Sequence, residues 1–170
     1  DLDEALRHLQ FPLFVKPAHA GDSLGVDEHS LVHTKEELFD KTASIIKEYA
    51  PLLVEEYIAG REFTALVAGN PDGKSCTVFR PVEYLFPKGK EFKTYSLKTS
   101  ELHPECNFPC TDEAINKKLR FAAEKIFTAV NAVGYGRLDF RVNDKNEIYF
   151  LEMNLTCSVF YKDGYEGSAD

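Results

Sequence analysis

Residues 136–154 contain two runs in which apolar and polar side chains alternate, separated by the turn-forming segment Asp144-Lys145-Asn146-Glu147. Alternation with period two on both sides of such a segment predicts a β-hairpin with one face packed on a core. A hairpin that is symmetric about this turn aligns polar residues across its strands, pairing Asp139 with Glu152 and Arg137 with Asn154. Any fold of this chain therefore has to present these polar residues on a common face of a sheet.

The two faces of the predicted hairpin differ in character. One is apolar and consists of Leu138, Phe140, Val142, Tyr149, Leu151 and Met153. The other consists of Arg137, Asp139, Arg141, Phe150, Glu152 and Asn154. Like charges directly opposite each other destabilise a strand pair, so Asp139 and Glu152 need a compensating cation. Carboxylate oxygens together with the amide oxygen of Asn154 suit Mg²⁺, which predicts a metal site. The alternative is a solvated face on which Arg137 and Arg141 neutralise the two acids.

Composition and charge narrow the class of protein. Of the 170 residues, 44% are hydrophobic and 28% are charged, as in ordinary soluble globular domains. The formal net charge of −8 argues against a nucleic-acid-binding protein, which would show a basic surface. No apolar run approaches the roughly 18 residues that span a bilayer, and no secretory leader is expected. Because Met153 is the only methionine, we expect the sequence to be part of a longer protein.

The four cysteines are Cys76, Cys106, Cys110 and Cys157. Their spacing matches neither a disulfide framework nor a paired metal-binding motif, which predicts free thiols in a cytoplasmic protein. Zinc binding by His103, Cys106 and Cys110 is the alternative. It is disfavoured because structural zinc sites use four ligands and no fourth ligand is close in sequence.

Helical and strand patterns are interspersed with hairpins along the chain, which predicts an α+β fold. A capping box at Thr34-Lys35-Glu36-Glu37 begins a helix that ends near Tyr49, and the longest helix covers 112–132. Residues 87–109 are irregular and rich in lysine and proline, as in a long functional loop. The remaining strands are predicted at 11–16, 31–33, 52–57, 63–68 and 76–84.

Lys16 ends an apolar strand and precedes a loop that contains Gly21, Ser23 and Gly25. Glycines let backbone amides approach a polyphosphate closely, and a lysine at the end of a strand supplies a fixed positive charge. The loop matches neither the Walker A spacing nor the Rossmann glycine pattern. A plain turn is the alternative interpretation.

Two further groups of charged residues are candidates for binding a nucleotide. Glu55 and Glu62 lie on either side of a turn, where their carboxylates could accept hydrogen bonds from an adenine amine and a ribose hydroxyl. Lys90, Lys93 and Lys98 lie in the irregular loop, which could close over phosphates. For both groups, the alternative is that the side chains are simply solvated.

Taken in order, these segments resemble the ATP-grasp superfamily, and most closely its D-alanine–D-alanine ligase branch. The resemblance covers most of the chain and rests on five ordered segments, namely 11–17, 21–26, 53–64, 92–98 and 136–154. It implies an α+β ATP-grasp fold with mixed or antiparallel sheets, in which two lobes sandwich ATP. We expect the central lobe at 1–60 and the C-terminal lobe, with the lid loop and the metal-binding hairpin, at 61–170.

The resemblance also implies a role for individual residues in binding ATP. Lys16 would contact the phosphates, and Gly21, Ser23 and Gly25 would belong to a flexible cover. Lys98 would reach the terminal phosphate from the lid. The adenine would be held by Glu55 and the backbone of Glu56, Tyr57 and Ile58, and the ribose by Glu62.

For the reaction, the resemblance implies an ATP- and Mg²⁺-dependent ligase. A carboxylate would attack the γ-phosphate, and an amine would then displace phosphate from the acyl phosphate to form an amide or peptide bond. Asp139, Glu152 and Asn154 would bind two Mg²⁺ ions, with Mn²⁺ as an alternative metal. Arg137 would stabilise the acyl phosphate, and Ser158 stands where a glycine amide usually holds the oxyanion. The implied partners are amino acid or peptide substrates, with neither nucleic acid nor membrane; homo-oligomerisation is left open.

The sequence departs from this pattern after Asn154, where the usual N-[TS]-x-P-G motif becomes Asn154-Leu155-Thr156-Cys157-Ser158. The 170 residues contain no counterpart of the family's N-terminal substrate lobe, which we expect to lie elsewhere in a longer protein. A nucleotide-binding regulatory module without ligase turnover is therefore the alternative function, and an α+β interaction domain that binds no nucleotide is a third.

Overall fold

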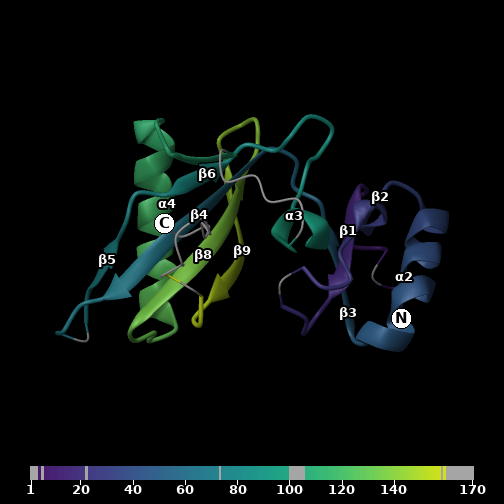
Figure 1. The fold of residues 1–170 in the computed structure, drawn as a ribbon, viewed down its shortest axis with the longest axis horizontal. Coiled ribbons are helices and arrows are strands. Elements are labelled where there is room, and N and C mark those ends of the chain that lie inside the picture. The colour runs from purple at the N-terminus through teal and green to yellow at the C-terminus, as the bar shows by residue number, and fades with distance from the viewer. Residues whose placement is uncertain are drawn as a thin grey trace. The chain divides into compact units, whose positions relative to one another are not determined.

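The computed structural model describes residues 4, 6–21, 23–72, 74–99, 106–157 and 159 of the chain. These residues form two compact units (Figure 1). The first combines the described residues of 1–57 with those of 90–102, and the second combines 58–89 with those of 103–170. The chain passes from the first unit to the second after Tyr57. The segment that follows Gly89, which the sequence analysis assigned to the second lobe, packs with the first unit.

The first unit is a three-stranded antiparallel sheet covered on one face by a helix. Its strands are β1 (Leu13–Pro17), β2 (Leu31–Val32) and β3 (Leu52–Glu56), in the order β2-β1-β3. The helix is α2 (Lys35–Tyr49). Alternate residues of β1 are fully buried because they pack against the apolar face of α2, and this core consists of Leu13, Val15, Val32, Leu38 and Ile45. The short helices η1 (Glu28–Ser30) and α3 (Tyr95–Thr99) complete this unit.

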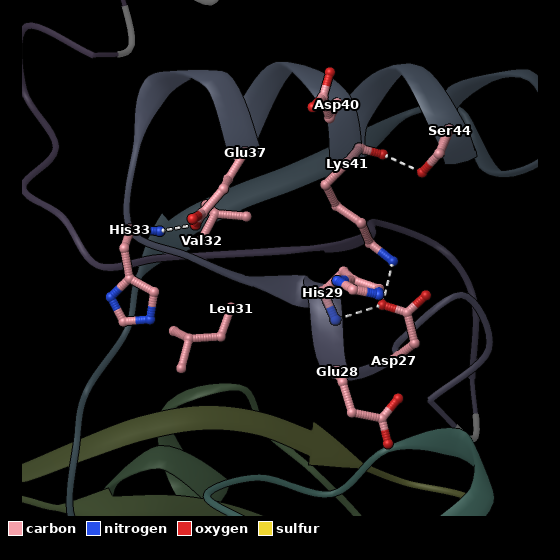
Figure 2. Close-up of a pocket in the computed structure, with 10 residues that line it drawn as sticks. All are labelled: Asp27, Glu28, His29, Leu31, Val32, His33, Glu37, Asp40, Lys41 and Ser44. Carbon is pink, nitrogen blue, oxygen red and sulfur yellow. Dashed lines mark hydrogen bonds and ion pairs between the residues drawn. The ribbon is translucent and has the colours of Figure 1, made fainter.

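The start of α2 is capped much as predicted. The Thr34 hydroxyl accepts a hydrogen bond from the Glu37 amide at 3.2 Å. The Glu37 carboxylate accepts one from the amide of His33 at 2.7 Å, one residue earlier than a capping box requires (Figure 2). The pocket drawn there is lined by residues of η1, β2 and α2, and by none of the residues predicted to bind ATP.

The second unit is a six-stranded sheet in which every pair of strands is antiparallel. The strand order is β7-β6-β4-β8-β9, and β5 also pairs with β4. The strands are β4 (Arg61–Gly69), β5 (Cys76–Val78), β6 (Val82–Tyr84), β7 (Asn107–Pro109), β8 (Tyr135–Val142) and β9 (Ile148–Asn154). The strand predicted at 76–84 is thus divided into β5 and β6. The segment predicted to be irregular at 87–109 contains α3 and β7.

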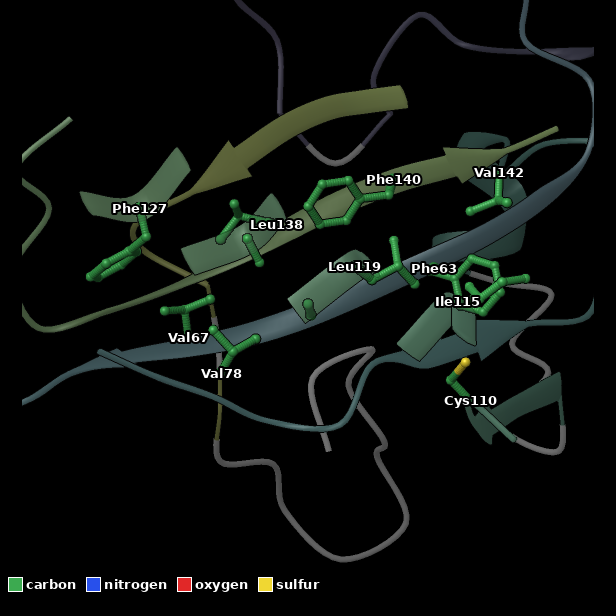
Figure 3. Packing of buried hydrophobic residues seen from close by; sticks show 12 residues of the cluster. Phe63, Val67, Val78, Cys110, Ile115, Leu119, Phe127, Leu138, Phe140 and Val142 are labelled. Atoms are coloured by element: carbon green, nitrogen blue, oxygen red, sulfur yellow. The ribbon is translucent and has the colours of Figure 1, made fainter. Parts of the chain in front are cut away.

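Helix α4 (Glu113–Ala129) packs on one face of this sheet and forms the larger core. Figure 3 shows its side chains meeting those of β4 and β8. The strands contribute Phe63, Ala65, Val67, Leu138, Phe140 and Val142, and the helix contributes Ile115, Leu119, Ala123 and Phe127. Each of these side chains is at most 2% exposed. The alternation that fills this face leaves the intervening residues of β4 and β8 on the opposite face.

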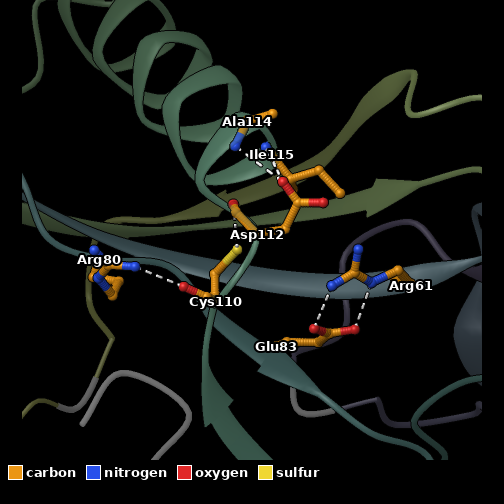
Figure 4. Close-up of polar contacts among 7 residues, drawn as sticks. All are labelled: Arg61, Arg80, Glu83, Cys110, Asp112, Ala114 and Ile115. Atoms are coloured by element: carbon orange, nitrogen blue, oxygen red, sulfur yellow. Dashed lines mark hydrogen bonds and ion pairs between the residues drawn. The ribbon is translucent and has the colours of Figure 1, made fainter.

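Polar contacts fix the start of α4 and the pairing of β4 with β6 (Figure 4). The Asp112 carboxylate accepts hydrogen bonds from the amides of Ala114 and Ile115, at 2.9 and 3.0 Å. Arg61 on β4 donates two hydrogen bonds to Glu83 on β6, of 2.7 and 2.6 Å. The hydrogen bonds to Glu83 raise the pKa of Arg61.

The register of the β8–β9 hairpin confirms the predicted polar pairs. Arg137 pairs with Asn154 and Asp139 with Glu152, as predicted. Phe140, however, pairs with Phe150, which leaves Leu151 as the extra residue of a β-bulge. The prediction that Tyr149 and Leu151 belong to the apolar face was therefore wrong. Phe150 lies beside Phe140, with ring centroids 5.8 Å apart, and Tyr149 pairs with Arg141.

The turn of this hairpin explains why the predicted pairing holds at the open end of the hairpin, at residues 137–139 and 152–154, and fails near the turn. Asn146 adopts a left-handed conformation, with φ of 58°, and its amide donates to the Asn143 carbonyl at 3.0 Å. This is a three-residue loop with a left-handed residue at its end. The predicted register was centred between Lys145 and Asn146. A loop of three residues shifts the pairing by one residue relative to that prediction, and the bulge at Leu151 shifts the pairing back by one residue.

Candidate functional site

The face of the second unit's sheet that lies opposite α4 carries most of the predicted site residues of this unit. Paired residues of antiparallel strands project from the same face. Glu62 pairs with Arg141 and Thr64 with Asp139, while Asp139 also pairs with Glu152 and Arg137 with Asn154. The structure therefore brings five predicted residues onto one face, namely Glu62, Arg137, Asp139, Glu152 and Asn154. We call them the polar row.

Asp139 lies near the middle of the polar row and is held by two neighbours. Its Oδ1 accepts hydrogen bonds from the Thr64 hydroxyl at 2.7 Å and from Arg137 Nε at 3.1 Å. Its Oδ2 accepts one from Arg137 Nη2 at 3.1 Å. Sequence reasoning missed Thr64, which is buried. The sequence did contain a signal for Thr64 as a site residue, because Thr64 and Glu62 are two residues apart on one strand and so share a face.

Arg137 supplies positive charge beside the two opposed acids. Burial lowers the pKa of its guanidinium, but the attraction of Asp139, the hydrogen bonds to it and the negative charge of Glu152 raise the pKa by more. Arg137 is therefore a permanent cation here. The salt-bridged alternative assigned this neutralising role to Arg141 as well. Arg141 is directed to Glu62, and their charged atoms lie 3.4 Å apart.

The oxygen donors of the polar row fit a hard divalent cation. Asp139 and Glu152 face each other across β8 and β9, and Asn154 follows Glu152 on the same face. Two carboxylates and an amide oxygen are the donor chemistry that Mg²⁺ accepts, with further positions open to phosphate oxygens. Among the described residues, no group of three or more histidine, cysteine, aspartate or glutamate side chains could hold a metal ion. The predicted set relies on Asn154 as its third donor.

In the first unit, Lys16 and Glu55 share the face of the sheet opposite α2. Phe14 pairs with Glu55 and Lys16 with Leu53, so all four project from that face. Lys16 Nζ lies 2.6 Å from Glu55 Oε1. The lysine predicted to bind phosphate and the acid predicted to bind adenine are therefore ion-paired.

The two residues that follow Glu55 make other contacts within the first unit. Glu56 accepts a hydrogen bond from the amide of Gln10 at 2.6 Å. The Tyr57 amide donates to the Pro12 carbonyl at 2.9 Å, so this predicted adenine-binding amide already has an acceptor. Ile58 begins the second unit.

The glycine-containing loop is built from two consecutive turns. The Leu24 amide donates to the Gly21 carbonyl and the Val26 amide to the Ser23 carbonyl, each at 3.0 Å. Gly25 has φ of 75°, and a Cβ placed on it would lie 2.8 Å from Pro17 Cγ. Because of both constraints, only glycine fits there without strain.

A buried lysine, which the sequence analysis did not single out, holds the end of this loop. Lys41 on α2 is 4% exposed. Its Nζ donates to the Gly25 carbonyl at 3.2 Å and to Asp27 Oδ1 at 2.8 Å. The loop is thereby tied to α2.

The predicted lid segment packs on the first unit through aromatic and polar contacts. The Phe92 ring lies 4.9 Å from that of Phe14 and 6.3 Å from that of Tyr57, centroid to centroid. The Tyr95 amide donates to the Val26 carbonyl at 3.2 Å, at the end of the glycine-containing loop. Lys98 lies in α3, and its side chain is outside the described part of the chain. Ser158 is also outside the described residues.

Residues 2–159 match the protein family described as the D-Ala D-Ala ligase C-terminus. The chain belongs to this family. A D-alanine–D-alanine ligase of Vesicomyosocius okutanii subsp. Calyptogena okutanii is 36% identical over 157 residues, which cover 91% of this chain and 50% of that protein. The chain spans about half the length, or less, of the curated relatives it matches.

Solved structures agree with this assignment. The VanG D-Ala:D-Ser ligase of Enterococcus faecalis superposes with a TM-score of 0.70 at 27% identity, covering 91% of this chain and 43% of that one. The D-alanine–D-alanine ligase of Bacillus anthracis complexed with ATP gives a TM-score of 0.65 at 22% identity, covering 91% and 44%, and supports the fold. This D-Ala D-Ala ligase C-terminal domain thus has the predicted α+β ATP-grasp fold with antiparallel sheets.

No helix among the described residues is both long enough and apolar enough to cross a membrane.

Proposed function

We propose that the chain is the ATP-binding portion of an ATP- and Mg²⁺-dependent carboxylate–amine ligase that forms an amide or peptide bond between amino acid or peptide substrates. The polar row is the observation that carries this proposal. Five residues from three strands, each expected to contact nucleotide, metal or reacting phosphate, project from one face of a sheet in register. Family membership supports the reaction class, since the matched relatives are named D-alanine–D-alanine ligases.

Each unit contributes side chains that suit part of a nucleotide. In the first unit, the charge of Lys16 and the Gly21–Gly25 loop suit phosphates. Glu55 and the backbone of residues 56–58 would hold adenine, apart from the Tyr57 amide, which already donates to the Pro12 carbonyl. In the second, Glu62 is an acceptor for ribose hydroxyls. Lys98 in α3 reaches the terminal phosphate in this proposal.

Asp139, Glu152 and Asn154 would hold the metal ions, two Mg²⁺ or alternatively Mn²⁺. When bound, the metal neutralises phosphate charge and orients the transferred group. The Asp139 carboxylate keeps its place without the metal, because Thr64 and Arg137 bind it through hydrogen bonds. A site held in this way loses little entropy when its ligand binds.

Arg137 has the position and the charge to bind the transferring phosphate. Phosphoryl transfer needs in-line positioning and neutralised charge more than a protein nucleophile. A fixed guanidinium that is protonated at all relevant pH values supplies this electrostatic stabilisation. The substrate carboxylate oxygen then forms a bond to the γ-phosphorus as ADP leaves. The amine nitrogen next bonds to the acyl carbon as phosphate leaves with its electron pair, and the amine loses a proton.

Cys76, Cys110 and Cys157 are not in disulfides, which is consistent with the proposed cytoplasmic location, where ATP and reduced thiols coexist.

Phosphate release by the full-length protein tests the proposed reaction. The protein is incubated with ATP and Mg²⁺, with and without a panel of D- and L-amino acids and short peptides. We expect phosphate release to depend on at least one of these substrates, with an amide product formed in equal amount. Phosphate release that no substrate stimulates would contradict ligase activity and favour a nucleotide-binding regulatory module.

A further inference from the structure

Arg141 is a buried cation that the proposed reaction does not use. Its side chain is 4% exposed and lies on β8 directly opposite Glu62 of β4. Its Nη1 donates to the Gly60 carbonyl at 3.2 Å, and its Nη2 lies 3.4 Å from Glu62 Oε2. Its Cζ lies 5.4 Å from the centroid of the Phe86 ring. One guanidinium therefore contacts three different groups.

These contacts suit arginine and no other cation. A guanidinium has five N–H donors in a planar fork, so it can serve a carbonyl and a carboxylate together while its flat face lies on an aromatic ring. Lysine has a single nitrogen and could not reach both oxygen groups with the same geometry. The burial of the site raises the cost of leaving either charge unpaired.

The backbone next to Glu62 is fixed at the same place. Gly60 has φ of 136°, and any Cβ on it would collide with the Val142 carbonyl. Arg141 holds the carbonyl of this glycine and the carboxylate of Glu62, which lie on either side of Arg61. The Glu62 side chain is only 14% exposed, so little freedom remains for its carboxylate.

We propose that Arg141 is a positioning residue that orients the Glu62 carboxylate to accept hydrogen bonds from the ribose hydroxyls of the nucleotide. The inference rests on the proposed function, because it takes Glu62 as the ribose contact. Arg141 itself touches no part of the nucleotide in this account. Its effect is transmitted through Glu62, and it should therefore alter how strongly the protein distinguishes ribose from deoxyribose.

The chain offers a matched control in Arg61. It forms an ion pair of the same kind with Glu83, at 2.6 Å, and belongs to the same strand as Glu62. It projects from the opposite face, where its Cζ lies 4.9 Å from the Phe63 ring centroid. Substituting Arg61 removes a comparable pair without touching Glu62.

Calorimetric affinities of the full-length protein for Mg-ATP, Mg-2′-deoxy-ATP and Mg-3′-deoxy-ATP test the inference. A hydrogen bond from a hydroxyl to a charged acceptor corresponds to roughly tenfold or more in affinity. In the wild type, we expect at least one deoxynucleotide to bind about tenfold or more weakly than ATP. This ratio should fall to about threefold or less in Arg141→Met and Glu62→Gln, and should stay at the wild-type value in Arg61→Met.

The possible outcomes distinguish a failure of the positioning role of Arg141 from a failure of the ribose contact assigned to Glu62. If Glu62→Gln loses the discrimination and Arg141→Met keeps it, the positioning role is refuted while the ribose contact stands. If Glu62→Gln keeps the discrimination, or the wild type shows none, the assignment of Glu62 fails and the inference fails with it. Should Arg141→Met not fold, Arg141→Lys takes its place. Lysine keeps the positive charge but lacks the planar fork of N–H donors. If Arg141→Lys distinguished ATP from the deoxynucleotides as strongly as the wild type, the inference would be overturned.

Discussion

Arg137 donates two hydrogen bonds to Asp139, from Nε to Oδ1 and from Nη2 to Oδ2, each 3.1 Å long. Both residues project from one face of β8, and Glu152 lies directly opposite Asp139 on β9. The arginine therefore offsets part of the repulsion between two carboxylates that a metal would otherwise have to neutralise. In the proposed metal-bound state, the arginine and the metal ion would together offset this repulsion.

Replacing Arg137 with methionine should make the folded state depend more strongly on Mg²⁺. Without the guanidinium, Asp139 and Glu152 are opposed with less compensation, so a bound cation relieves more repulsion. We expect the rise in melting temperature on adding Mg²⁺ to be larger in Arg137→Met than in the wild type, and substrate-dependent phosphate release to fall by about 100-fold or more. Arg61→Met is the control, and its Mg²⁺ response should match the wild type. An equal Mg²⁺ response in both arginine variants would contradict this account.

Replacing Thr64 with valine should weaken the metal site at a modest cost in stability. The substitution keeps the shape but removes the hydroxyl that donates to Asp139 Oδ1 at 2.7 Å. We expect the free energy of unfolding to fall by about 1–3 kcal/mol. Because groups that orient a metal ligand matter for affinity, the affinity for Mg²⁺ should fall by about 10- to 100-fold.

Thr77→Val provides a comparison for the threonine change. The hydroxyl of exposed Thr77 is on β5 and donates to Asn70 Oδ1 at 3.0 Å, and Thr77 pairs with Ala68 near the end of β4 rather than with Thr64. Chemical denaturation and calorimetric Mg²⁺ titration of both variants measure the two effects. A Mg²⁺ affinity that is the same in both variants would show that Thr64 does not orient Asp139 for the metal.

Gly25→Ala should destabilise the protein, whereas Gly21→Ala should not. Gly25 has φ of 75°, and its new Cβ would lie 2.8 Å from Pro17 Cγ, while a Cβ on Gly21 meets nothing within 4 Å. The left-handed conformation alone costs an alanine about 1–2 kcal/mol. Thermal unfolding of the two variants measures the difference. Equal melting temperatures would show that the loop relaxes freely around residue 25.

Acid should release the contact between Glu28 of η1 and Lys90. The hydrogen bond from Lys90, 2.8 Å long, is the largest of the effects that lower the pKa of Glu28. A carboxylate with a lowered folded-state pKa contributes stability above its unfolded pKa and loses it as the pH falls through the folded-state value. The difference in melting temperature between the wild type and Glu28→Gln should therefore be largest near neutral pH and shrink below about pH 4. A difference that does not change with pH would contradict the assignment.

The sequence predicted the polar row well because alternation is a local property of each strand. The pairs Asp139–Glu152 and Arg137–Asn154 were confirmed. The predicted sheet faces of residues 149–151 were wrong, because a three-residue loop and a bulge at Leu151 cannot be recognised from the alternation of apolar and polar residues. Their shifts in pairing cancel at Asp139, and this preserved the prediction there.

Contacts between distant parts of the chain could not be predicted in this way. Phe92 lies beside Phe14 and Tyr57, which are far from it in sequence, so nothing local showed that residues 90–97 pack with the first unit. The ion pair of Arg141 with Glu62 depends on β4 lying next to β8. The charges of both residues were visible in the sequence, but their partners were set by the strand order.

Binding of ATP to the full-length protein in the presence and absence of Mg²⁺, measured by calorimetry, tests the central claim that the polar row binds metal and nucleotide. The comparison is between the wild type and the double variant Asp139→Asn, Glu152→Gln, which keeps the size of both side chains. We predict that Mg²⁺ strengthens ATP binding by the wild type by about tenfold or more, and has little effect on the double variant. Indistinguishable Mg²⁺ dependence in the two proteins would contradict the metal site.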